Sequence, residues 1–118
     1  MTPKSAVTLL YQGEKIKSGI IWANELVQSV SGLTGLEKTG AEKMVASLIR
    51  MMGFESVLAR RITRDEAWTQ VEKDLDMALV MIDSGVFHEA SFHLAKALRG
   101  ATGVSQKAMT YLMDEGVL

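Results

Sequence analysis

Cysteine is absent from this 118-residue sequence, and proline occurs only once, at position 3. Without cysteine, the protein has no disulfide framework, no thiolate-bound zinc ion and no thiol nucleophile. Because the single proline lies at the start, no proline interrupts a helix in the rest of the chain. The composition therefore excludes several classes of site and favours long helices.

Neither sign of charge is in excess, and no long hydrophobic run is present. Thirteen Lys and Arg face fourteen Asp and Glu, a net charge of −1, so no overall field attracts nucleic acid or anionic lipid. The longest apolar run, Met77 to Ile82, has six residues, whereas a membrane span needs about 20. Met1 to Ser5 lead into a mixed segment rather than the apolar core of a signal peptide. We therefore expect a cytoplasmic protein.

The patterns that usually carry chemistry are also missing. No nucleophile, base and orienting residue form a recognisable set, and no strand precedes a glycine-rich phosphate loop. His88 and His93 resemble the zinc motif H-E-x-x-H, but they lie five residues apart. Side chains at that spacing point about 140° apart around a helix and cannot share one ion. We expect no enzymatic activity, no metal and no cofactor.

Helical periodicity extends along most of the chain. Thr2 and Pro3 are typical of a helix start, and the segment that follows carries apolar or small residues at steps of four and three, which predicts one buried seam. Ser31 and Gly32 are expected to end this helix. The seam consists of Leu9, Gly13, Ile16, Ile20, Ala23, Val27 and Val30.

Capping boxes and glycines predict the remaining helix boundaries. Thr39 with Glu42, and Thr63 with Glu66, match the capping box, in which threonine and glutamate each bond the other's backbone N–H. At Gly53 we expect either a kink in the first of these two helices or a change between two packing surfaces.

The last third of the chain is expected to contain two helices. Gly100 and Gly103 should separate a helix at 87–99 from a short one that Ser105 caps. The sequence thus predicts an all-α fold with residues 1–118 in a single domain. This domain is a helical bundle of four main helices plus a short C-terminal helix, arranged as an antiparallel bundle or two hairpins.

Methionine and tryptophan provide the first functional hypothesis. Thioether side chains fill gaps in cores, and they also form surfaces that adapt to a partner; both interpretations remain open. Trp22 and Trp68 lie beside the apolar seams of their helices, where indole rings anchor interfaces or pack at a core edge. The candidate interface residues are Trp22, Met44, Met51, Trp68, Met77, Met81, Met109 and Met113.

A second hypothesis concerns nucleic acid. Residues 87–113 loosely resemble a helix-turn-helix element, although the connection from Arg99 to Val104 is longer than the usual turn. Basic and amide side chains there and near position 60 are candidate contacts to phosphates and bases. The arginines equally complement a helix dipole, and acidic residues follow both groups. The candidate contacts are Arg60, Arg61, Arg64, Gln106 and Lys107.

The sequence favours the first hypothesis, because it combines a surplus of apolar helix surface with no site chemistry. We expect a non-enzymatic interaction or scaffolding protein that self-associates, as a homodimer, through apolar, methionine-rich helix faces. The alternative is a small DNA-binding regulator that uses the helix-turn-helix-like element at 87–113.

Overall fold

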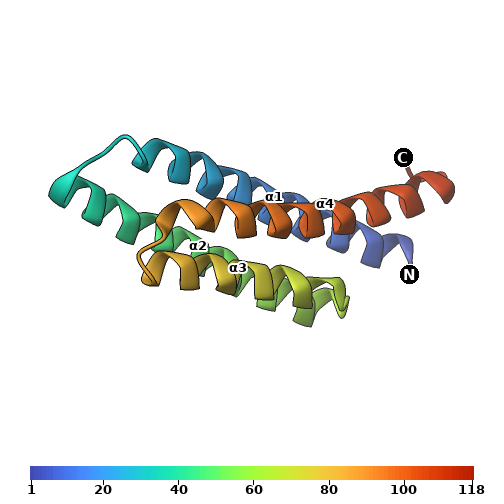
Figure 1. Cartoon of the computed structure of the whole chain (residues 1–118). Coiled ribbons are helices and arrows are strands. Elements are labelled where there is room, and N and C mark those ends of the chain that lie inside the picture. Colours follow the sequence, from blue (N-terminus) through green and yellow to red (C-terminus); the bar gives the residue numbers. More distant parts are fainter.

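Four long helices make up nearly all of the computed structural model, which describes residues 1–118 (Figure 1). No strand is present, so the predicted all-α class is confirmed. A single 3₁₀ turn, η1, precedes the last helix. The helices are α1 (Pro3–Val30), α2 (Gly35–Thr63), α3 (Ala67–Asp83) and α4 (Ala90–Asp114), and η1 spans Phe87–Glu89.

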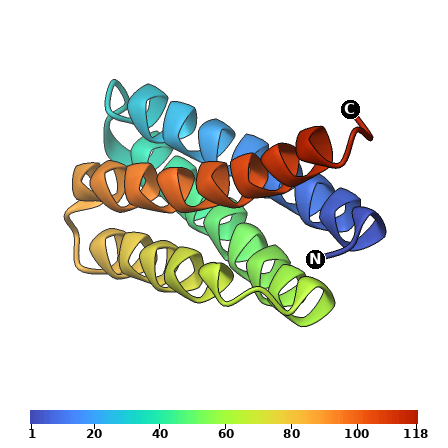
Figure 2. The same cartoon turned by 90° about the vertical axis from the view of Figure 1, so that its right-hand side faces the viewer.

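The four helices alternate in direction along the long axis of the molecule, which measures 54 × 22 × 17 Å. Helix α1 packs against α2 and α4, and α3 also packs against α2 and α4. Helices α2 and α4 therefore lie diagonally across the bundle from one another, and Figure 2 shows α4 in front with α2 behind it. Because each of these two helices has only two neighbours, one broad face of each points outward.

The N-terminal helix follows the sequence closely. Thr2 accepts a hydrogen bond from the Ser5 backbone N–H, and Ser5 accepts one from Thr2, which completes a capping box at the predicted start. Every position of the predicted seam is buried, and the helix ends at Val30. These contacts place the seam in a core of 20 buried residues drawn from all four helices and η1.

Helices α1 and α4 approach so closely that a side chain is excluded between them. A Cβ atom on Gly13 would lie 2.3 Å from Ser105 Oγ and 3.2 Å from Ser105 N. The first separation would be a direct overlap and the second is tighter than most Cβ contacts, so the two backbones pack closely at this point. The sequence predicted that Ser105 caps a helix start. Ser105 is instead buried in the middle of α4.

The predicted division near Gly100 and Gly103 is wrong, because α4 is continuous from Ala90 to Asp114. Two glycines cost a helix about 1 kcal/mol each relative to alanine, and packing against α1 and α3 outweighs that cost. Gly100 lies where α4 approaches α3, since a Cβ there would lie 2.8 Å from Val71 Cγ2. The short fifth helix does not exist as a separate element.

Both predicted capping boxes after residue 30 are also wrong. Thr39 lies inside α2, which begins at Gly35, and its hydroxyl donates to the Gly35 carbonyl at 3.3 Å. Thr63 is the last residue of α2, and α3 begins only at Ala67. A threonine hydroxyl bonds to the carbonyl four residues earlier as readily as it caps. Helix α2 continues through Gly53.

Two glycine-to-alanine variants test the packing of α4. Gly13→Ala should lower the free energy of unfolding by about 1–3 kcal/mol, because the new methyl group meets the Ser105 backbone. Gly103→Ala should instead raise it by up to about 1 kcal/mol, because this site is helical and nothing lies within 4 Å of the added atom. Denaturant unfolding at a fixed protein concentration measures both. Equal destabilisation by the two variants would contradict a continuous α4.

Candidate functional site

Helix α2 is the least buried of the four helices. Five of its 29 residues are buried, compared with ten of 28 in α1. Within α2, no residue before Val45 is fully buried, and only Ala41 of these first turns packs against the core. Helical turns without tertiary contacts are only marginally stable in water. The outward side of α2 is therefore a candidate partner surface.

That outward side is apolar along its whole length. Six large apolar residues, between 46% and 90% exposed, follow one another at helical spacing and lie on one face. Gly40 and Ser47 occupy the remaining positions of the same face and are exposed. We call this surface the α2 stripe; its large residues are Leu36, Met44, Met51, Phe54, Leu58 and Ile62.

The stripe is extended on one side by α1. The Lys15 ammonium group contacts Glu55 Oε2 at 2.7 Å, and Gly19 lies against Met52, so these contacts fix how α1 and α2 are aligned. Tyr11, four residues before Lys15, and Trp22, seven residues after it, share the face of Lys15 that adjoins α2. Both rings are 63% exposed. The apolar surface therefore covers parts of two neighbouring helices.

A shallow hollow of about 260 Å³ lies on the other side of the stripe, between α2 and α3. Phe54 belongs to both the stripe and the hollow. Charged side chains of Arg50, Glu72 and Asp76 contribute to its lining. The apolar lining consists of Ile49, Phe54, Val57, Leu75 and Leu79.

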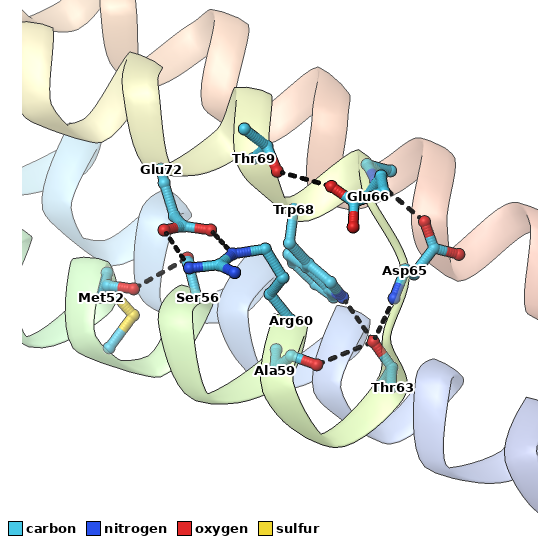
Figure 3. Close-up of polar contacts among 11 residues, drawn as sticks. Met52, Ser56, Ala59, Arg60, Thr63, Asp65, Glu66, Trp68, Thr69 and Glu72 are labelled. Carbon is cyan, nitrogen blue, oxygen red and sulfur yellow. Dashed lines mark hydrogen bonds and ion pairs between the residues drawn. The ribbon is translucent and has the colours of Figure 1, made fainter.

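A polar network holds the corner where α2 turns into α3 (Figure 3). The Arg60 guanidinium group donates to both carboxylate oxygens of Glu72, at 2.7 and 3.4 Å, and this bonding raises the pKa of Arg60. The Trp68 indole donates to the Thr63 hydroxyl at 3.2 Å, and that hydroxyl donates to the Ala59 carbonyl at 2.7 Å. Trp68 is fully buried, so its prediction as an interface residue is wrong.

Asp65 begins α3 by accepting a hydrogen bond from the Ala67 backbone N–H at 2.9 Å. The same carboxylate pairs with Lys107 on α4. Burial alone would raise the pKa of Asp65, but the bonds from Lys107 and Ala67 outweigh it, and the pKa is lowered below its ordinary value. This one side chain thus joins the start of α3 to α4.

The candidate nucleic-acid contacts do not form one group of free side chains in the structure. Arg60 and Lys107 are engaged by Glu72 and Asp65, whereas Arg61, Arg64 and Gln106 are exposed. The turn that a helix-turn-helix requires between 99 and 104 is replaced by continuous helix. Residues 87–113 therefore consist of the 3₁₀ turn η1 and one continuous helix, without the turn of a helix-turn-helix.

The other predicted interface residues lie on different surfaces. Met44 and Met51 belong to the stripe, and Trp22 flanks it. Met81 is half-buried against the core. Three more are exposed but belong to other helices: Met77 on α3, and Met109 and Met113 on α4.

Four members of the stripe were not identified from the sequence, namely Leu36, Phe54, Leu58 and Ile62. Their regular helical spacing indicates an apolar face of α2. However, α2 carries a second apolar face containing Val45 and Ile49, which is the buried one. Periodicity alone does not say which of two apolar faces the bundle covers.

No group of three or more His, Asp or Glu side chains lies close enough together to hold a metal ion. None of the helices combines the length and apolar character that a membrane-crossing helix needs. Comparison with protein families, with characterised proteins and with solved structures finds no match for this chain.

Asp65 gives a pH-dependent test of the α3 start. Asp65→Ala should cost about 1 kcal/mol of unfolding free energy at pH 7, because it removes the hydrogen bond from the Ala67 N–H and the ion pair with Lys107, and Asp65→Asn should cost less, because the amide oxygen still accepts from Ala67. A lowered native pKa stabilises the fold above the unfolded Asp pKa, and this contribution disappears as pH falls through the native pKa.

Denaturant unfolding at pH 7 and at about pH 3, below the ordinary Asp pKa, measures the contribution of Asp65 to the free energy of unfolding. Both measurements use one protein concentration. The difference between wild type and Asp65→Asn should shrink in acid. A difference that stays constant or grows would show that the Lys107 pair does not stabilise the native state.

Proposed function

We propose that this protein is a non-enzymatic interaction or scaffolding protein that associates with a second copy of itself through the α2 stripe. The observation that carries the proposal is the α2 stripe itself, a face with six large apolar side chains that are 46% to 90% exposed. Soluble monomers rarely expose apolar patches beyond a few hundred Å², and larger ones usually mark interaction sites.

The energy available from covering the stripe supports association. Full burial of one such side chain contributes roughly 1.5–3 kcal/mol, and two copies present twice the six residues of one stripe. The gain per residue is smaller than this, because the side chains are already partly covered in the single chain. Even half of it is of the size needed to offset the roughly 4–15 kcal/mol that association costs.

The charges around the stripe favour a protein partner over lipid or nucleic acid. Lys43 and Arg50 border one side, and Glu37 and Glu55 border the other. A helix that lies on a membrane surface is instead rich in Lys and Arg on its polar face. With a net charge of −1, the whole molecule lacks the positive field that supplies non-specific nucleic-acid affinity. The proposal places the protein in the cytoplasm.

Matched lysine variants test the surface. Phe54→Lys should weaken association at least about thirtyfold, because a central aromatic residue typically contributes 2 kcal/mol or more. Phe92→Lys should have no effect, because Phe92 is also well exposed, 64% against 77%, but lies on α4 across the bundle from α2. Light scattering after size exclusion gives the native mass of each protein.

Wild type and Phe92→Lys should have twice the 12.9 kDa mass of the chain at micromolar concentration, and Phe54→Lys should have the single mass. Circular dichroism of each variant confirms that it is folded. A wild-type mass of one chain at this concentration would overturn the proposal.

A further inference from the structure

We propose that the two copies pack their α2 helices antiparallel, with the twofold axis at the level of residue 49, so that small residues of each stripe face large residues of the other. This inference rests on the self-association proposed above and specifies its geometry. The order of residue sizes along the stripe and the position of Trp22 support it, and the charges beside the stripe oppose it more weakly.

Residue size along the stripe has a pattern that an antiparallel pair matches. The two small members, Gly40 and Ser47, lie in the first half, and the large residues Met51 and Leu58 lie in the second half. Reversing the direction of one copy about residue 49 brings Ser47 opposite Met51 and Gly40 opposite Leu58. The same operation places Met44 opposite Phe54 of the second copy.

A parallel pair would produce a poorer fit. Each stripe residue would then meet its own counterpart near the axis, so that glycine faces glycine and leucine faces leucine. Packing is densest where large and small residues alternate across facing positions, and poor volume matching in a packed interface costs about 1–3 kcal/mol per site. The order of small and large residues along the stripe therefore favours the antiparallel arrangement.

The charges beside the stripe favour the parallel arrangement, but their contribution is smaller. In a parallel pair, Arg50 of one copy would approach Glu55 of the other, which lies five residues later on the facing edge. Arg50 has no ion-pair partner within the chain, and Glu55 binds Lys15. An exposed ion pair contributes about 0–1 kcal/mol, which is less than the packing difference at two sites.

The antiparallel arrangement also leaves acidic groups near Arg50. The edge of the stripe that carries Arg50 adjoins α3, where Asp76 lines the same hollow. Rotation about the proposed axis brings this edge of one copy against the same edge of the other, so Asp76 and Arg50 of both copies lie on one side of the interface. The same rotation brings the two Arg50 residues toward one another near the axis, and the Asp76 carboxylates lie on that side of the interface.

Trp22 lies near the proposed twofold axis. Gly19 lies against Met52, and α1 and α2 have opposite directions. Moving one turn along α1, from Gly19 to Trp22, therefore corresponds to moving one turn back along α2, from Met52 to Leu48. In the antiparallel pair both α1 helices lie on the same side, so the two exposed Trp22 rings meet where aromatic anchors are most effective.

The surface available for this interface approaches the size typical of stable dimers. The stripe from Leu36 to Ile62 is about 40 Å long at about 1.5 Å per residue. A standard interface buries about 800 Å² on each partner, so a strip of this length must be about 20 Å wide. One helix face supplies about half that width. The flank formed by Tyr11, Trp22 and Leu26 on α1 widens the surface along about 22 Å of its length.

Disulfide cross-linking tests the orientation, because the natural chain has no cysteine. Gly40→Cys and Leu58→Cys each introduce one thiol on the stripe, and nothing lies within 4 Å of a Cβ atom at Gly40. The two variants are mixed in reductant, left to exchange subunits and then oxidised. Intact mass spectrometry separates the three cross-linked products by mass. Phe92→Cys on α4 measures the background from random collisions.

The antiparallel pair predicts that the mixed product between residues 40 and 58 exceeds each self-linked product at least about tenfold, because only facing Cβ atoms come within the roughly 4 Å that a disulfide requires. Dominant self-linked products at both positions would mean a parallel pair, which overturns this inference but leaves the proposed function standing. If the stripe variants cross-link no more than Phe92→Cys does, and the native mass is still that of a dimer, the interface lies elsewhere on the molecule. The same background with the mass of one chain would overturn both proposals.

Discussion

Helix α2 carries apolar side chains on two opposite faces, and the bundle covers only one of them. The inner face packs against α1 and α3 through residues such as Val45 and Ile49. The outer face has no neighbour, because α4 lies diagonally across the bundle. A helix with apolar residues on opposite faces is normally enclosed on both sides. This excess of apolar surface is the constraint from which the functional proposals derive.

The other helices pack closely on one another, and α1 and α3 contact only the inner side of α2. Gly13 and Ser105 allow α1 and α4 to pack backbone against backbone, and Gly100 allows α4 to approach Val71 of α3. Helix α4 therefore fills the space between α1 and α3 on one side, and α2 closes the other. The Arg60–Glu72 pair and the buried Trp68 hold α2 to α3 at the corner they share.

The sequence was sufficient where local and tertiary signals agree. In α1 the cap at Thr2, the proline at position 3 and the buried seam all indicate the same helix. It was insufficient where one residue type has two uses. Thr39 and Thr63 bond backward to carbonyl groups inside α2 instead of capping a new helix, and Gly100 and Gly103 lie within α4 because packing outweighs their low helix propensity.

The candidate site was predicted only in part for a similar reason. Met44, Met51 and Trp22 were identified by residue type and spacing, and they do lie on or beside the exposed surface. Trp68 has the same position relative to its own seam but is enclosed by the α2–α3 corner. The choice between an inner and an outer face depends on which helices are neighbours, and that arrangement is a property of the whole fold.

Amide hydrogen exchange along α2 at two protein concentrations tests the central claim most directly. The turns between Thr39 and Met44 contain no fully buried side chain, and only Ala41 packs against the core, so in a single chain their hydrogen bonds should open readily. If a second copy covers them, exchange there should slow markedly at high concentration and quicken on dilution, while exchange in α4 changes little. Exchange in these turns that is equally fast at both concentrations would contradict the account.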